Sequence, residues 1–118
     1  MKIKFNKDIF LKESKELFLE IFMNSYNSNY ILDFTDVLGK VIEVYFRKYE
    51  VDDVINNIGY NKVDLQNWYE FDEEGFSNYF DDCSIIKNYR EALSYYSLNH
   101  LFLENHEKEL DEIINNLD

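Results

Sequence analysis

The chain contains no proline and only three glycines in 118 residues, so few positions interrupt regular secondary structure. An average chain of this length carries about six prolines. Proline breaks helix interiors because it lacks a backbone N–H, and glycine weakens them because its backbone is flexible. The three glycines are Gly39, Gly59 and Gly75, and with so few interrupting residues we expect long elements.

Apolar side chains recur at helical spacing in the N-terminal part of the chain. Residues 7–26 predict a first helix with Asn6 as its N-cap, followed by an Asn- and Ser-rich connection over residues 24–29. From Phe34 onward, apolar residues are separated by alternating steps of three and one positions, which predicts a second helix with one broad buried stripe. This stripe is Phe34, Val37, Leu38, Val41, Ile42, Tyr45, Phe46 and Tyr49. The β-branched and aromatic run 41–46 leaves a strand as the alternative.

The rest of the chain predicts one short and one long helix. Residues 52–58 have an acidic start and precede Gly59, a favourable C-cap, whereas residues 60–82 show no clear period. From Ser84, the expected N-cap, a row of residues spaced by four and three runs to the end of the chain. This row, which we call the predicted seam, is Tyr89, Leu93, Tyr96, His100, Leu103, Glu107, Leu110, Ile114 and Leu117.

The predicted seam fits one long helix or two helices interrupted near Asn105. Packing within the monomer is the first interpretation, and a homodimer through residues 89–117 is the second. Together these patterns predict an all-α fold, a single compact domain over residues 1–118 with four to five helices and a long C-terminal helix. The alternative is an α+β fold with a small sheet around residues 30–47.

Several classes of protein are disfavoured by the sequence. Apolar residues form 46% of the chain, with ten Phe and ten Tyr, which is too much apolar surface for a disordered acidic tail. The single Cys83 precludes an internal disulfide framework, and the charged first residues do not resemble a signal peptide. No run approaches the roughly 18–20 apolar residues of a membrane span. We expect a cytoplasmic protein.

The net charge of −12 is unevenly distributed. Residues 1–48 hold eight basic and seven acidic side chains, whereas residues 49–118 hold four basic and seventeen acidic ones. Such an acidic half repels nucleic acid and anionic membranes and attracts basic protein surfaces. We therefore expect a basic protein partner, with no direct binding to nucleic acid or membrane.

Residues that support catalysis or metal binding are sparse. His100 and His106 are six positions apart, which places them on different faces of a helix, and no glycine-rich phosphate loop or zinc motif is present. The run Glu70–Asp81 only loosely resembles an EF-hand calcium loop, with Glu70 and Asp81 in place of the usual first Asp and last Glu. We expect a solvated acidic turn there, no metal, no cofactor and no enzymatic activity.

The segment from Asp64 to Asp82 combines seven carboxylates and six aromatic residues without any Lys or Arg. Carboxylates accelerate encounter with a basic partner, and desolvated aromatic side chains hold a complex together. Alternatively, the aromatic residues belong to the core and the acids serve solubility. The predicted partner-binding residues are Tyr69, Glu70, Asp72, Glu73, Glu74, Tyr79, Asp81 and Asp82.

In size, charge and composition, the whole chain resembles small acidic immunity proteins and antitoxins that bacteria make beside toxic nucleases. It also resembles the acidic, anti-CRISPR-like inhibitors by which phages block nucleic-acid-binding defence proteins. In both groups carboxylates occupy a cationic cleft in place of phosphates. The resemblance implies an immunity protein or antitoxin first and a phage-encoded nucleic-acid mimic second. A homo-oligomeric helical scaffolding protein is the third hypothesis.

Overall fold

A computed structural model describes residues 1–28, 30, 32–58 and 86–117 of the chain. These residues form four helices, α1 (Lys7–Asn27), α2 (Phe34–Lys48), α3 (Val51–Ile58) and α6 (Tyr89–Asn115). The helices have 21, 15, 8 and 27 residues, so more than half of the chain is helical. The all-α fold with a long C-terminal helix is confirmed.

Helix α1 begins as the sequence predicts but ends later. The side chain of Asn6 accepts a hydrogen bond from the backbone N–H of Ile9 at 3.0 Å, which confirms Asn6 as the N-cap. The helix continues into the predicted connection and ends at Asn27. The hydroxyls of Ser25 and Ser28 donate to carbonyls three residues earlier, so these polar side chains are satisfied without leaving the helix.

Helix α2 contains the residues for which a strand was the alternative. Its buried side chains are Val37, Leu38, Val41, Ile42, Tyr45 and Phe46. A strand would place Val41, Glu43 and Tyr45 on the same face and would bury the charge of Glu43. In the helix Glu43 instead pairs with Arg47 one turn further on, at 3.0 Å. The alternative prediction of a small sheet around residues 30–47 is therefore wrong.

Helix α6 is continuous through Asn105, so the predicted interruption is absent. Its predicted N-cap, Ser84, is wrong because the helix begins at Tyr89 and is capped by Asn88. The side chain of Asn88 accepts from the backbone N–H of Glu91 at 3.0 Å, and Glu91 in turn accepts from the backbone N–H of Lys87 at 2.7 Å. This reciprocal arrangement is a close variant of a capping box.

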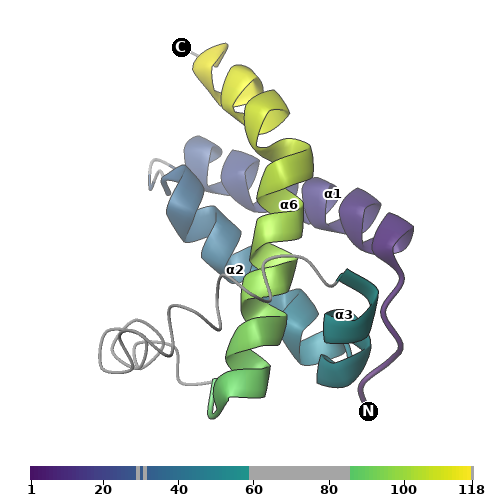
Figure 1. Ribbon diagram of the computed structural model, residues 1–118. Coiled ribbons are helices and arrows are strands. Elements are labelled where there is room, and N and C mark those ends of the chain that lie inside the picture. The colour runs from purple at the N-terminus through teal and green to yellow at the C-terminus, as the bar shows by residue number, and fades with distance from the viewer. Residues whose placement is uncertain (29, 31, 59–85, 118) are drawn as a thin grey trace, which may run out of the picture.

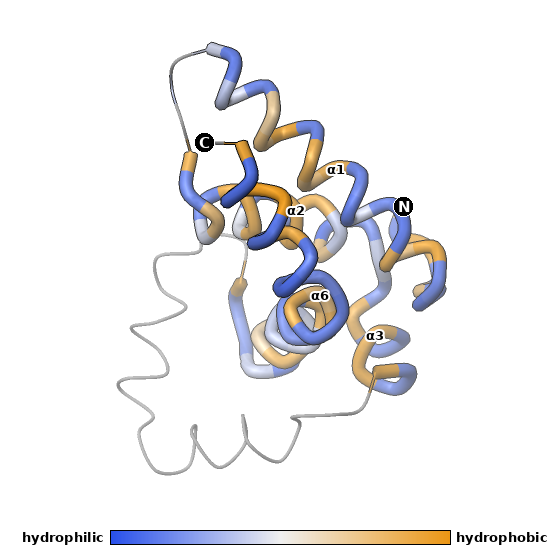
Figure 2. Tube along the Cα trace, turned by 90° about the horizontal axis from the view of Figure 1, so that it is seen from above, coloured by the Kyte–Doolittle hydropathy of each residue, from blue (hydrophilic) through white to orange (hydrophobic). Residues whose placement is uncertain are grey.

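The other three helices pack around α6 (Figures 1 and 2). In Figure 1 α6 crosses α1 and α2, and its N-terminal end lies beside α3. Figure 2 looks nearly along α6, with α1 and α2 on one side and α3 on another. Among the described helices, none combines the length and apolar character needed to cross a lipid bilayer.

The buried face of α6 changes along the helix because different helices cover different turns. Ala92 and Leu93 form a small apolar cluster with Ile55 of α3. Further along, the ring of Phe102 lies 5.7 Å from that of Phe18 of α1. The fully buried residues after the first turns are Ser97, Leu98, Leu101, Phe102 and Leu110. Most of the predicted seam packs within the monomer, as its first interpretation expects, whereas Glu107 is exposed. Leu93 and Leu110 are buried, and the seam residues partly buried against the core are Tyr89, Tyr96, Leu103, Ile114 and Leu117.

The N-terminal residues form an extended segment against the junction of α2 and α3. The backbone N–H of Ile3 donates to the carbonyl of Lys48, and the N–H of Glu50 donates to the carbonyl of Ile3, both at 2.9 Å. The Phe5 ring packs against the rings of Phe10 and Tyr49, at centroid distances of 5.9 and 5.1 Å. This segment therefore closes the core between α1 and α2.

Candidate acidic interface

The eight predicted partner-binding residues lie outside the described residues, as do Cys83 and the calcium-like run 70–81. Their role therefore stays a prediction from the sequence. The eight residues are Tyr69, Glu70, Asp72, Glu73, Glu74, Tyr79, Asp81 and Asp82.

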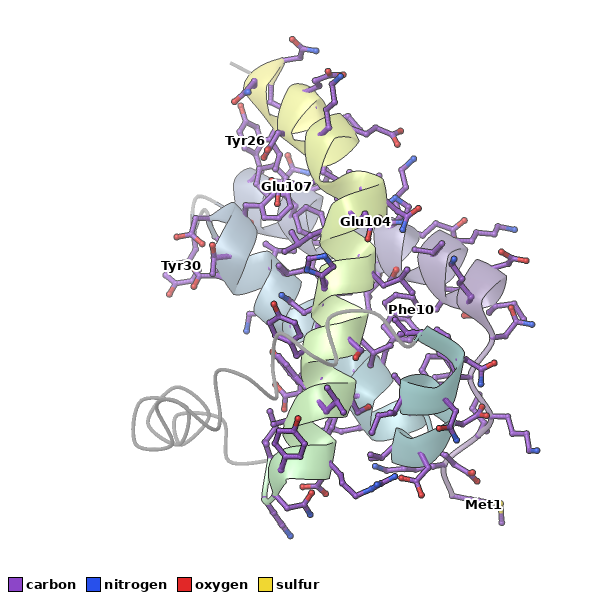
Figure 3. All side chains as sticks on the ribbon, in the orientation of Figure 1. Met1, Phe10, Tyr26, Tyr30, Glu104 and Glu107 are labelled. Atoms are coloured by element: carbon purple, nitrogen blue, oxygen red, sulfur yellow. The ribbon has the colours of Figure 1, made fainter. Side chains whose placement is uncertain are left out.

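The C-terminal half of α6 carries a second group of carboxylates, which we name the α6 acidic face. Its members are exposed and come at helical spacing, so they lie on adjoining parts of the helix surface. Figure 3 labels two of them, Glu104 and Glu107, on the part of α6 that leads to its C-terminal end. The α6 acidic face consists of Glu104, Glu107, Asp111 and Glu112.

The core holds this part of α6 in place. Leu110 is fully buried between the acidic positions, and Ile113 and Ile114 pack against the main apolar cluster. The hydroxyl of Tyr26 on α1 donates to the carbonyl oxygen of Leu117 at 3.2 Å, just beyond the end of the helix. The acidic face is therefore displayed on a helix that is fixed to the core on its other side.

The positions of these carboxylates are unfavourable for the isolated helix. The C-terminal end of a helix carries partial negative charge, and α6 has no basic residue in its last turn. Glu104 and Glu107 are three residues apart, and Glu107 and Asp111 are four apart, so they are like-charged neighbours. Each such pair costs about 0.2–0.5 kcal/mol.

The acidic face contains one cation, Lys108, which lies four residues from Glu104 and four from Glu112 on the same helix. In the described part of the chain, Glu107, Asp111 and Glu112 form no salt bridge, and Glu104 is 3.9 Å from Nε2 of His100. Four other acids on the described surface are paired with Lys or Arg, whereas others, such as Glu16 and Glu20, form no salt bridge there either. These pairs are Lys15 with Glu109 (2.6 Å), Arg47 with Glu43 (3.0 Å), Lys48 with Glu13 (3.7 Å) and Arg90 with Asp52.

Glu109, a neighbouring carboxylate, differs from the acidic face because it is paired with a lysine of α1. It lies on the side of α6 that faces α1, where its Oε1 accepts a hydrogen bond from Nζ of Lys15. That hydrogen bond, together with the charges of Lys15 and His106, holds the pKa of Glu109 below its usual range. The negative charge of Glu109 is thus neutralised within the chain, whereas the charge of the acidic face remains available to a partner.

The two histidines face different surroundings, as their spacing predicts. Nε2 of His106 lies 2.8 Å from the carbonyl oxygen of Leu11, so an N–H at this nitrogen ties α6 to α1. His100 lies on the acidic side, with its ring stacked on Tyr96 and its Nε2 near Glu104. Among the described His, Cys, Asp and Glu residues, no group of three is arranged to hold a metal ion.

The sequence contains a signal for the acidic face that the spacing of apolar residues does not reveal. Five of the nine residues from 104 to 112 are acidic. Glu107 was assigned to the predicted seam, but in the structure it is exposed. Acids at steps of three and four, with apolar residues between them, indicate a charged face beside a buried one.

The described helices and the α6 acidic face define an all-α protein with an acidic surface on its C-terminal helix. No protein-family model, curated protein or solved structure matches this chain.

Proposed function

We propose that this protein binds a cationic protein through its carboxylates and acts as an immunity protein or antitoxin against a basic, nucleic-acid-acting toxin. The observation that supports it best is the α6 acidic face, where four exposed carboxylates lie close together and none of them forms a salt bridge with Lys or Arg among the described residues.

The physical logic is that of charge complementarity. A protein that acts on nucleic acid presents a cationic cleft for phosphates, and a rigid row of carboxylates can occupy the same cleft. Long-range attraction accelerates the encounter, and the fixed helix lowers the ordering cost of the complex. The acidic segment from Asp64 to Asp82 adds seven carboxylates to the same half of the sequence, and we include its predicted residues in the proposal.

A phage-encoded inhibitor of a nucleic-acid-binding defence protein rests on the same observation and is the second candidate.

The scaffolding hypothesis, with a homodimer through residues 89–117, has less support. Leu93 and Leu110 of the predicted seam are already buried within the chain, at 4% and 0% exposure. Fewer apolar side chains are therefore left for a dimer interface.

The experiment begins with capture of the partner from the cells that carry the gene, followed by purification of that partner. Its affinity is then measured for the wild-type protein and for the double variant Glu107→Lys/Asp111→Lys. The matched control is Glu16→Lys/Glu20→Lys, which reverses two exposed acids at the same spacing on α1. A nucleic-acid cleavage assay shows whether the wild-type protein neutralises the partner.

We expect the α6 double variant to lose affinity on the order of tenfold or more, which is at least about 1.4 kcal/mol. The loss should be largest at low salt and should include slower association. The α1 control should change affinity far less, and both variants should remain helical. An acidic or neutral partner, or equal losses from both variants, would contradict the proposal.

The sequence-predicted residues are tested in the same assay. The triple variant Asp72→Lys/Glu73→Lys/Glu74→Lys should weaken binding if the segment contributes to the interface. If this triple variant binds as tightly as wild type while the α6 variant does not, the interface lies on α6 and the segment is only a solubilising surface.

A further inference from the structure

A groove of about 320 Å³ lies between α2 and α6, beside the α6 acidic face. Phe34, Leu38 and Gly39 of α2 form one wall, and Asn99, Leu103 and Glu107 of α6 form the other. The groove is thus mainly apolar along its length. One member of the acidic face, Glu107, lies at its edge.

Gly39 is the most informative residue of this groove. It lies in the middle of α2, where a glycine costs roughly 0.5–1 kcal/mol relative to alanine. A Cβ atom added at Gly39 would meet no atom within 4 Å, so no close helix packing requires a glycine at this position. The absence of a side chain at Gly39 leaves room in this part of the groove.

The surroundings of the groove are acidic. Glu104 and Asp111 flank Glu107 on α6, and both are exposed. On α2, Asp33 and Asp36 are exposed at the N-terminal end, close to Phe34 in the chain. Figure 3 shows this end of α2, marked by Tyr30, on the same side of α6 as Glu107. The nearby cations are Lys40 and Lys108, so carboxylates are in excess.

We propose that this groove receives an apolar side chain, flanked by Lys or Arg, from the cationic partner. This inference rests on the proposed function and adds an anchor point to it. The open, apolar wall at Gly39 leaves space for a large aromatic ring of the partner. The carboxylates on both sides of the groove can pair with the Lys or Arg residues that flank that ring. Such a combination of a desolvated anchor and a charged rim is typical of binding hot spots.

Synthetic peptides test the groove without knowledge of the natural partner. The probe is a short peptide with one tryptophan flanked on each side by two Lys or Arg residues. A second peptide has alanine in place of tryptophan, and a third has Glu in place of the basic residues. Two-dimensional amide NMR of the isotope-labelled protein reports both the affinity and the location of each peptide.

We expect the tryptophan peptide to shift the amide resonances of Thr35, Gly39, Asn99 and Leu103 and to bind on the order of tenfold more tightly than the alanine peptide. The acidic peptide should not bind. The variant Gly39→Phe fills the groove and should abolish the advantage of tryptophan. The matched control Val44→Phe, at a 46% exposed position of the same helix, should keep that advantage.

Gly39→Phe should fold normally because the added side chain enters open space, and thermal melting checks this. If both basic peptides bind equally, or if neither binds, the groove proposal is overturned while the charge-based function can stand. If the groove resonances shift with protein concentration in the absence of peptide, a second copy of the chain is the occupant, and the proposal is also wrong. If the captured partner proves acidic, the proposed function itself fails.

Discussion

Tyr45 and Tyr49 form a stacked pair in the core between α1 and α2, with ring centroids 5.9 Å apart. Both side chains are buried, at 5% and 1% exposure. The hydroxyl of Tyr49 has no hydrogen-bond partner among the described residues, so its desolvation is not compensated. A buried polar group without a partner costs about 1–3 kcal/mol.

Removal of this hydroxyl should stabilise the protein. We expect Tyr49→Phe to raise the free energy of unfolding by about 1 kcal/mol, because the ring contacts remain and the unpaired group is lost. Urea unfolding followed by circular dichroism measures the effect. The control is Tyr26→Phe, which removes a hydroxyl that donates to Leu117 and should lower stability. A loss of stability in Tyr49→Phe would mean that its hydroxyl has a partner.

Tyr45 should make the protein sensitive to alkaline pH. Burial, followed by the charges of Glu13, Tyr49 and Glu16, raises its pKa from 10.0 to about 12. Below pH 10 both the folded and the unfolded state keep the proton, so the full stability is present. Between pH 10 and about 12 the unfolded state loses the proton first, so stability falls.

The expected contribution of Tyr45 to this loss is at most about 1.4 kcal/mol per pH unit. Tyr45→Phe retains the ring and cannot ionise, so its unfolding free energy should decline less steeply than that of wild type across the same pH range. Equal slopes for the two proteins would show that burial does not raise the pKa of Tyr45.

At the scale of single elements, the N-cap of α6 supports the longest helix of the structure. Asn88 accepts from Glu91, and removal of such a cap costs about 1 kcal/mol. We expect Asn88→Ala to lower the free energy of unfolding by this amount. Asn88→Asp should keep most of the wild-type stability, because aspartate is an equally good N-cap. Chemical denaturation measures the free energy of unfolding of each variant. If Asn88→Ala is as stable as wild type, the assigned start of α6 is wrong.

Local signals predicted the elements well where one set of neighbours covers a helix. The stripe of α2 is continuous because α1 and α6 bury adjoining parts of the same face. Asn6 was recognisable as a cap because its side chain bonds to the third residue after it, which is a local interaction. The true cap of α6 was missed because Ser84 and Asn88 are both good N-cap residues and only the observed start of the helix distinguishes them.

At the scale of the whole molecule, net charge opposes folding. The chain carries −12, and the carboxylates of the α6 acidic face add local repulsion. The described ion pairs involve exposed or half-buried side chains, so each contributes little. Self-repulsion between carboxylates should therefore outweigh these pairs in the response of stability to salt.

We expect the melting temperature to rise with sodium chloride, because ions screen exposed charges beyond about 10 Å at 0.1 M. A gain of about 1 kcal/mol corresponds to about 4 °C for a domain of this size. The variant Glu107→Lys/Asp111→Lys carries less repulsion and should respond less to salt. A melting temperature that falls as salt is added would show that ion pairs dominate instead.

The sequence alone determined the helical fold class, three helices close to their observed bounds and a helical C-terminal region, because spacing, caps and the scarcity of breakers are local properties. It left open whether that region is one helix or two, and the structure shows one helix. The tertiary structure decided which face of α6 is buried at each turn, since α3, α2 and α1 cover it in succession. It also decided the candidate site. Glu107 is exposed and Leu110 is buried only because α1 packs on one side of this helix, and Gly39 lines a groove only because α6 lies beside α2.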